Sequence, residues 1–315
     1  MKAIRWAVTV LLIVVIISIA GLFCAERTEL GKPAVTGIRQ ELGEITDSES
    51  EILTSVTVQN PNPVSIALVA IEADVLMNGE RIGKMSSVGN TELKASQVSV
   101  LLLSTKIDNQ KIRGWWMSHI KNGERTEVRI PMNLIFDLGL TKHKYPIVFN
   151  SSLKTDILSD LDLVQEELAG LPDEPASLTL KSMNSRFGEV TDKETEVITT
   201  LVVANRCPVK ISGYYYEIVM NEVTVGEGRV AANFARDSAT AITFITPIRN
   251  DKINEWWVSH LKNGERTELK LNIQPVVEVN GIKYNYTMLE AETEFTTSIL
   301  STLSEVFVYR WHVLY

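Results

Sequence analysis

Two nearly identical phrases hold the residues of this chain that could do chemistry. WWMSHIKNGERTE begins at Trp115, and WWVSHLKNGERTE begins at Trp256. Each phrase contains a histidine, His119 or His260, together with glutamates, and these residue types act as general acids, general bases and metal ligands. The repetition therefore marks either a catalytic site made twice or the structural signature of a duplicated domain.

The residues around His119 and His260 favour the structural interpretation. Each histidine stands seven positions after an isoleucine, at the edge of an apolar helical face, with no further histidine, cysteine or carboxylate at ligand spacing. No serine or cysteine nucleophile has a partnering base, and no glycine-rich phosphate loop occurs. We therefore predict structural histidines and a protein that is not an enzyme. The prediction includes no catalytic residues, no metal and no cofactor.

Apolar spacing predicts one short helix in each phrase. From Ile112 the tryptophans and Ile120 follow at +3, +4 and +8, and the same spacing starts at Ile253. The predicted helix ends are Asp108 or Asn109 and Asn250 as N-caps, and Asn122–Gly123 and Asn263–Gly264 as left-handed C-terminal residues. The glutamates and arginines that follow are expected to face outward from the next strand.

The paired tryptophans are large enough to dominate the interior of a small domain. One tryptophan buries about 150–250 Å², which contributes on the order of 4–6 kcal/mol of gross burial energy. We therefore predict that Trp115, Trp116, Trp256 and Trp257 close the open end of each domain and do not stack on a ligand.

A second repeated stretch shows that a whole domain is written twice. Residues 44–64 align with residues 189–209 at an offset of 145, whereas the tryptophan phrases are 141 apart. The second copy has therefore lost four residues, which we place around Lys84 to Lys94. The predicted organisation is a first domain at 33–158, a helical linker at 159–176, a second domain at 177–300 and an apolar tail at 301–315.

Within each copy the dominant pattern is that of β-strands. Apolar and β-branched residues alternate with polar ones over 52–59 and 126–134, and again over 267–274. Asn78–Gly79 and Asn280–Gly281 are typical hairpin turns. The chain is expected to be mainly β, with two antiparallel sandwiches that each carry one short helix.

Asn60–Pro61–Asn62–Pro63 interrupts the first of these strands. Proline removes a ladder donor and forces the preceding residue into an extended conformation, so the strand must break and turn here. The side-chain amide of Asn60 or Asn62 can satisfy the freed backbone groups. The second copy keeps Asn205 and Pro208 with Arg206 and Cys207 between them, so the shared property is a turn and not a chemistry.

Composition narrows the class of partner. The formal net charge is -8 and basic residues are not clustered, which argues against nucleic acid. The two cysteines, Cys24 and Cys207, are expected to be unpaired.

Residues 1–30 predict a membrane anchor. An apolar run from Trp6 to Ala25 follows Lys2 and Arg5 and has roughly the 20 residues that a bilayer core of about 30 Å requires. We favour an uncleaved single-pass helix over a signal peptide cut after Ala20, with the N-terminus cytoplasmic and both domains extracytoplasmic. Two sequons, at Asn150 and Asn285, agree with that location as candidate glycosylation sites.

The combination of motifs resembles the WHy (water stress and hypersensitive response) domain, also called the LEA14-like or group 2 late embryogenesis abundant domain. The resemblance rests on Asn60–Pro61–Asn62, the helix with Trp116, and Asn122–Gly123 before an alternating strand, and it extends over both copies. It implies immunoglobulin- or fibronectin-like sandwiches without known catalytic activity and an association with desiccation. Membrane-tethered tandem versions resemble archaeal members most.

The resulting hypothesis is a non-enzymatic, membrane-anchored protein that protects or contacts envelope components during water stress. The alternative is an anchored β-sandwich module that binds an envelope protein or a glycan through its loops or edge strands.

Overall fold

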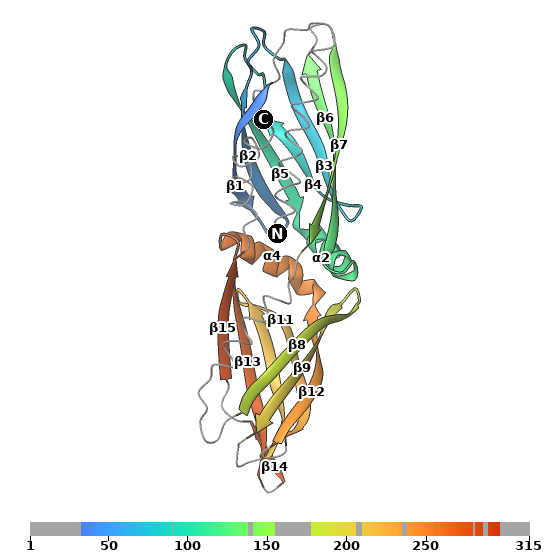
Figure 1. Ribbon diagram of the computed structural model, residues 1–315, viewed down its shortest axis with the longest axis vertical. Coiled ribbons are helices and arrows are strands. Elements are labelled where there is room, and N and C mark those ends of the chain that lie inside the picture. Colours follow the sequence, from blue (N-terminus) through green and yellow to red (C-terminus); the bar gives the residue numbers. More distant parts are fainter. Residues whose placement is uncertain are drawn as a thin grey trace. The chain divides into compact units, whose positions relative to one another are not determined.

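The computed structural model describes residues 33–89, 91–137, 141–154, 178–205, 210–234, 238–279, 281–285 and 289–296 (Figure 1). They form two compact units, called here the first domain (33–154) and the second domain (178–296). The expected anchor, linker and tail lie outside the described residues, as do Cys24, Cys207 and Pro208. Within the described part of the chain, no helix is long and apolar enough to cross a membrane.

The first domain is one antiparallel sheet with a helical insertion. Its strands are β1 (Ala34–Ile45), β2 (Glu49–Gln59), β3 (Leu68–Met77), β4 (Glu80–Val88), β5 (Val98–Asp108), β6 (Arg125–Asp137) and β7 (Lys142–Lys154). They pair in the order β1-β2-β5-β4-β3-β6-β7. The 3₁₀-helix η1 (Asn109–Lys111) and the α-helix α2 (Ile112–Lys121) connect β5 to β6.

The two ends of this sheet share one core. Val56 of β2 and Leu103 of β5 cluster with Ile71 of β3 and Ile130 of β6, and all four are almost fully buried. Strands that are distant in the hydrogen-bonding order can share a core only if the sheet folds over, and β4 joins the two parts. The structure therefore differs from two separate sheets, because a single continuous sheet makes both layers.

The second domain repeats this path. Its strands are β8 (Leu178–Val190), β9 (Glu194–Asn205), β10 (Lys210–Met220), β11 (Val223–Phe234), β12 (Ser238–Arg249), β13 (Arg266–Val279), β14 (Ile282–Asn285) and β15 (Leu289–Thr296). They pair in the order β14-β13-β10-β11-β12-β9-β8, and β15 also pairs with β13. The helices are η2 (Asn250–Lys252) and α4 (Ile253–Lys262). The prediction of a mainly β chain with antiparallel sheets and two short helices is confirmed.

Equivalent hydrogen bonds locate the four residues that the second copy lacks. Thr46 and Thr191 accept equivalent hydrogen bonds in the first hairpin turn of each domain, and they are 145 positions apart. The asparagines that bind these two turns, Asn109 and Asn250, are 141 positions apart. Between them, Asn78 and Asn221 each bind the first residues of the strand after the helix, at an offset of 143. Two residues are therefore lost before the β10–β11 turn and two after it, so the placement of all four near Lys84 to Lys94 was wrong.

Candidate functional site

The start of each helical segment is tied to a distant hairpin by a buried asparagine. Asn109 Nδ2 donates to Thr46 O at 2.9 Å, and its Oδ1 accepts from Ser50 Oγ at 2.8 Å. In the second domain Asn250 donates to Thr191 O at 2.8 Å and accepts from Thr195 Oγ1 at 2.7 Å. These bonds fix the entry of the chain into the helix against the first hairpin of each domain.

The predicted N-caps are therefore only partly correct. Asp108 caps η1, because its carboxylate accepts the backbone N–H of Gln110 at 3.0 Å. In the second domain the cap position is Arg249, which makes no side-chain capping bond, and Asn250 lies one residue further on. Asn250 uses its amide on the hairpin, so it is not a cap.

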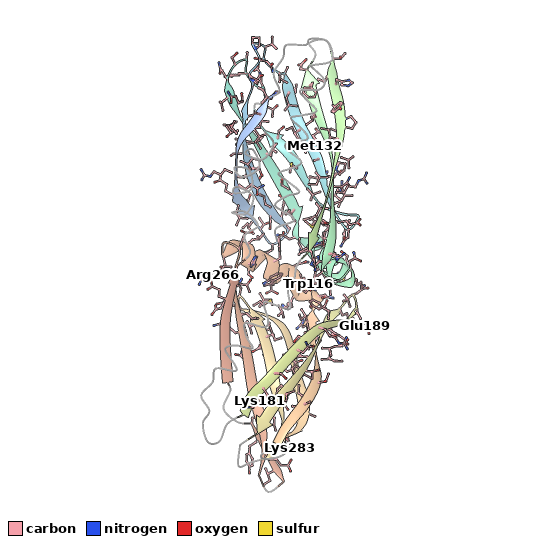
Figure 2. All side chains as sticks on the ribbon, in the orientation of Figure 1. Trp116, Met132, Lys181, Glu189, Arg266 and Lys283 are labelled. Atoms are coloured by element: carbon pink, nitrogen blue, oxygen red, sulfur yellow. The ribbon has the colours of Figure 1, made fainter. Side chains whose placement is uncertain are left out.

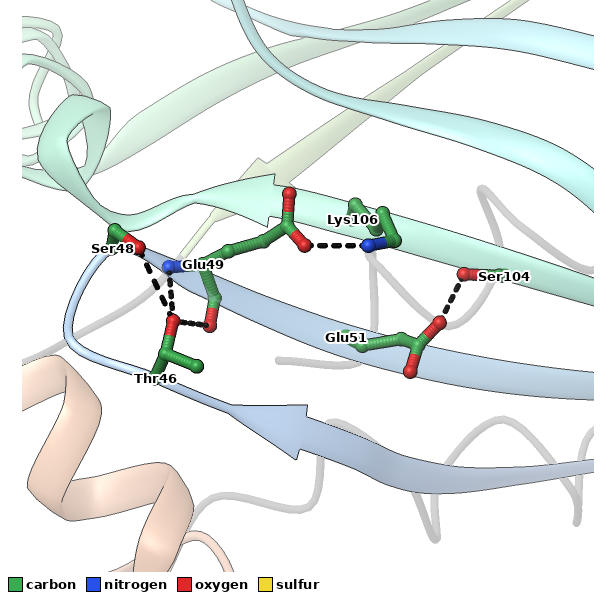
Figure 3. Close-up of polar contacts among 6 residues, drawn as sticks. All are labelled: Thr46, Ser48, Glu49, Glu51, Ser104 and Lys106. Atoms are coloured by element: carbon green, nitrogen blue, oxygen red, sulfur yellow. Dashed lines mark hydrogen bonds and ion pairs between the residues drawn. The ribbon is translucent and has the colours of Figure 1, made fainter.

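Figure 3 shows the hairpin that Asn109 holds in the first domain. Thr46 Oγ1 accepts from Glu49 N at 2.9 Å and closes the turn, while Glu49 pairs with Lys106 at 2.7 Å. Next to this pair, Ser104 of β5 donates to the carboxylate of Glu51. Glu49 and Glu51 are two positions apart on β2, so both contacts fix the hairpin to β5 on the same face of the sheet.

One tryptophan of each pair is buried and the other is half-buried. Trp116, labelled in Figure 2, and Trp257 are 5% and 9% exposed. Trp115 donates its indole N–H to Thr126 Oγ1 at 2.9 Å, and Trp256 donates to Thr267 Oγ1 at 3.1 Å. The first tryptophan of each pair therefore closes the corner with a hydrogen bond as well as with apolar area.

The two histidines share these threonines. His119 Nδ1 lies 2.7 Å from Thr126 Oγ1, and His260 Nδ1 lies 2.7 Å from Thr267 Oγ1. Both imidazoles are 0–1% exposed, which is deeper than the edge position expected from the helical spacing. Each domain therefore contains a Trp–Thr–His corner in which one hydroxyl bridges two rings.

Burial controls the charge of these histidines. It lowers the pKa of His119 and of His260 to about 4, because a charged imidazolium would lose its hydration in the interior. Both rings are therefore neutral near pH 7. Within the described residues, no group of three or more histidine, cysteine or acidic side chains is placed to hold a metal ion.

The turns after both helices are left-handed, as the Asn–Gly pairs predicted. Gly123 and Gly264 have φ values of 64° and 68°. The next residues, Glu124 and Glu265, are also left-handed, at 58° and 63°. Glu265 is only 5% exposed, so the expectation that the glutamates here face outward is wrong for this residue.

A second asparagine positions the strand that carries the bridging threonine. In the β3–β4 turn, Asn78 Oδ1 accepts from Glu127 N at 2.8 Å and its Nδ2 donates to Ser118 Oγ at 2.8 Å. In the β10–β11 turn, Asn221 accepts from Glu268 N at 2.8 Å. The hairpin turn is thus connected to both the helix and the strand of the corner.

The Asn–Pro–Asn turn has a structural use in the first domain. Asn60 is completely buried, and its Nδ2 lies within 3.0–3.2 Å of the carbonyl oxygens of Val64, Leu93 and Lys94. Its Oδ1 accepts from Asn62 N at 3.1 Å and from Asn62 Nδ2 at 2.9 Å. The amide thus satisfies backbone groups at the strand break, as expected for Asn60 or Asn62. In the second copy, residues 206–209 and the side chain of Asn205 are outside the described part.

The two sequon asparagines are accessible. Asn150 lies on the edge strand β7 and Asn285 at the end of β14, and both are exposed. Glycosylation at these positions stays a prediction.

Comparison with known proteins finds a family match within the first domain. Residues 55–148, from β2 to β7, match the family described as "Late embryogenesis abundant protein". The match supports the late embryogenesis abundant (LEA) family. No curated protein matches the chain at a significant level.

Solved structures similar to this chain include one that is described as a LEA protein. A crystal structure of a protein from Archaeoglobus fulgidus is 35% identical, covers 38% of this chain and is itself 98% covered, with a TM-score of 0.33. A solution structure from Arabidopsis thaliana is 21% identical and covers 40% of this chain, and 82% of its own chain is covered, with a TM-score of 0.30. A structure described as a LEA protein is 16% identical, with 46% and 83% coverage and a TM-score of 0.29. Because these TM-scores are low, the assignment rests on the match to residues 55–148.

The LEA match encloses the corner of the first domain, and sequence reasoning had missed the contacts of several residues of that corner. Asn78 was predicted only as a turn residue, and Asn109 and Asn250 only as helix caps. The roles of Thr126, Asn221 and Thr267 were not predicted. All six are identical between the two copies. Identity at equivalent positions was therefore the signal that could have found them.

Proposed function

We propose that this protein is a non-enzymatic, membrane-anchored LEA14-like protein whose two β domains lie outside the cytoplasm. There they protect or contact envelope components during water stress. The observation that carries the proposal is the LEA match over the folded first domain, at residues 55–148. The apolar run at residues 6–25 supports the anchor.

The corner geometry indicates how such a protein would act. The tryptophan, histidine and threonine side chains of each corner bind one another inside the fold. Chemistry at these groups would require the domain to open. Protection is therefore assigned to contacts of the folded surface with dried membranes or proteins, and not to a reaction.

Drying of lipid vesicles tests the protective role. Vesicles carrying a trapped dye are dried with the full chain inserted and then rehydrated, and the retained dye is measured. We expect greater retention than with an inert membrane-anchored protein of equal mass at the same molar ratio. Equal retention in the two samples contradicts the protective role.

Protease treatment of intact cells tests the location. Both domains are expected to be cut in intact cells, while a cytoplasmic control protein survives until lysis. Domains that become sensitive only after lysis contradict the proposed topology. A stoichiometric partner recovered from solubilised envelope would instead support the binding-module alternative.

A further inference from the structure

Among the described residues, the outer face of the first domain carries an exposed apolar strip. Val98, Val100 and Leu102 alternate along β5, and Val88 of β4 pairs with Leu102. These four residues, called here the aliphatic stripe, are 58%, 52%, 47% and 46% exposed in the order Val98, Val100, Leu102 and Val88. Figure 1 shows β4 and β5 side by side in this sheet.

Such residues are unusual on the outward face of an antiparallel sheet, where polar side chains are the rule. The neighbouring strand follows the rule, since Thr57 pairs with Val100 and Ser55 pairs with Leu102. The stripe is therefore a local departure from the pattern of this sheet.

The second domain shows that the fold does not need the stripe. Val98, Val100 and Leu102 correspond to Ala239, Ala241 and Thr243, which pair with β9 as the stripe residues pair with β2. Ala241 and Thr243 are also exposed. Because both copies form the same sheet, the larger aliphatic residues of the first copy require a reason other than folding.

A second feature also occurs in only one copy. The segment after the second domain ends in FVYRWHVLY, at residues 307–315, and nothing similar follows the first copy. Its alternate residues are Phe307, Tyr309, Trp311, Val313 and Tyr315, the pattern of a strand with one aromatic face. Unlike the shared core, neither this segment nor the stripe has a counterpart in the other copy.

We propose that the aromatic face of residues 307–315 docks on the aliphatic stripe of the same chain. Four half-exposed aliphatic side chains present roughly a few hundred Å², well below the about 800 Å² per partner of a stable protein–protein interface. A segment on the same chain is present at an effective concentration of about millimolar when its tether is short and flexible, so a small contact area is sufficient. A separate partner would need a larger surface.

The proposed docking of residues 307–315 on the aliphatic stripe does not depend on the proposed function. The ten residues 297–306 separate the last described strand from the aromatic segment and span at most about 33–36 Å. The docking involves only this tether, the aromatic segment and the stripe. It could therefore hold while the membrane or stress role fails, and the reverse is also true.

Trypsin accessibility of the segment tests the proposal. Arg310 is the only lysine or arginine after Lys283, so cleavage there releases the pentapeptide 311–315, which mass spectrometry detects. In the full chain held in lipid nanodiscs, we expect slow release. The variant V98A/V100A/L102T, which copies the second domain, should release the peptide at least about tenfold faster.

A matched variant controls for lost apolar surface. V69A/V148A/I245T removes three exposed aliphatic side chains outside the stripe and should release the peptide at the wild-type rate. The thermal midpoints of both variants are compared first, to show that the domains remain folded. Equal release from wild type and both variants contradicts the proposal. Protection that disappears on dilution also contradicts it, because it would place the segment on another molecule.

The reciprocal experiment measures the accessibility of the aliphatic stripe. In a C24A/C207A background, alkylation of a V100C variant should be slow, and it should accelerate about tenfold when F307S/Y309S/W311S is added. Alkylation at the same rate with and without these three changes would overturn the proposal.

Discussion

At the scale of single residues, the bridging threonine explains why the repeated phrase contains both tryptophan and histidine. An indole N–H can only donate, whereas a hydroxyl donates once and accepts twice. Thr126 can therefore accept from Trp115 and donate to Nδ1 of neutral His119. In that arrangement the ring carries its proton on Nε2. The repeated phrase thus forms a polar cluster in which the indole N–H, the hydroxyl and the imidazole Nδ1 have hydrogen-bond partners inside the fold.

Thr126→Val should destabilise the first domain by about 2–4 kcal/mol. Valine keeps the shape of threonine but leaves the Trp115 N–H and the His119 Nδ1 without this partner, at about 1–3 kcal/mol for the buried imidazole and less for the half-buried indole. Chemical denaturation followed by tryptophan fluorescence measures the loss. Thr126→Ser keeps the hydroxyl and should cost clearly less. A valine variant as stable as the serine variant would show that the bridge contributes little.

The residues found from sequence and those missed differ in the distance of their partners. Asn122–Gly123 was predicted because a helix end depends on neighbours in the chain, and Asn60 because the adjacent proline exposes local backbone groups. Asn109 binds Ser50 and Thr46, which are 59 and 63 positions away. A single sequence contains no local signal for such a contact.

At the scale of elements, the two copies solve one hairpin turn with different residues. Asn78 and Gly79 have φ values of 50° and 82°, and Asn221 and Glu222 have 47° and 67°. Two successive positive φ values define the turn that Asn–Gly favours. Glu222 therefore occupies a conformation that its Cβ disfavours. The turn of the second copy was not recognised from sequence because its glycine is missing.

Exchanging the second turn residue should change the unfolding free energies of the two domains in opposite directions. Glu222→Gly should raise the unfolding free energy of the second domain by about 0.5–1 kcal/mol, and Gly79→Glu should lower that of the first by about 1 kcal/mol. A Cβ at Gly79 would meet nothing within 4 Å, so the backbone alone decides the result. Thermal unfolding of the two single variants measures both changes. A loss of stability in both would contradict the assignment of strain to Glu222.

Strand existence was easier to predict than strand pairing. Alternation identifies a half-buried strand locally, and β2 and β6 follow it closely. The continuity of the sheet depends on β4, which pairs with β3 on one side and β5 on the other. Pairing partners are not encoded in the alternation itself, so the single folded sheet could not be foreseen.

At the scale of the whole molecule, the two copies also differ in their cores, away from the Trp–Thr–His corner. The core pair Ala73 and Met85 of the first domain is replaced by Tyr216 and Gly228 in the second. A Cβ on Gly228 would lie 2.5 Å from the Tyr216 hydroxyl oxygen, so the small residue makes room for the large one. Interior differences are thus compensated within one copy, in contrast to the aliphatic stripe.

The paired buried histidines predict a common acid sensitivity of both domains. The pKa of each imidazole is about 4 in the folded protein and about 6.5 in the unfolded chain, so the unfolded state binds more protons between these values. Stability is fully present above pH 6.5 and falls as the pH decreases toward 4, by at most about 3 kcal/mol for each domain. Denaturant unfolding at intervals between pH 7 and pH 4 measures this decrease.

The matched variant is His119→Gln with His260→Gln, which removes both titrating rings and keeps polar side chains. It should be less stable at pH 7 but should lose less stability than wild type as the pH falls from 6.5 to 4. Carboxylates such as Asp251, whose pKa Arg249 holds below its usual range, titrate in both proteins and cancel in the comparison. Parallel pH curves for the two proteins would mean that the histidines are not neutral in the folded state. In that case the corner would be held by a charged imidazolium.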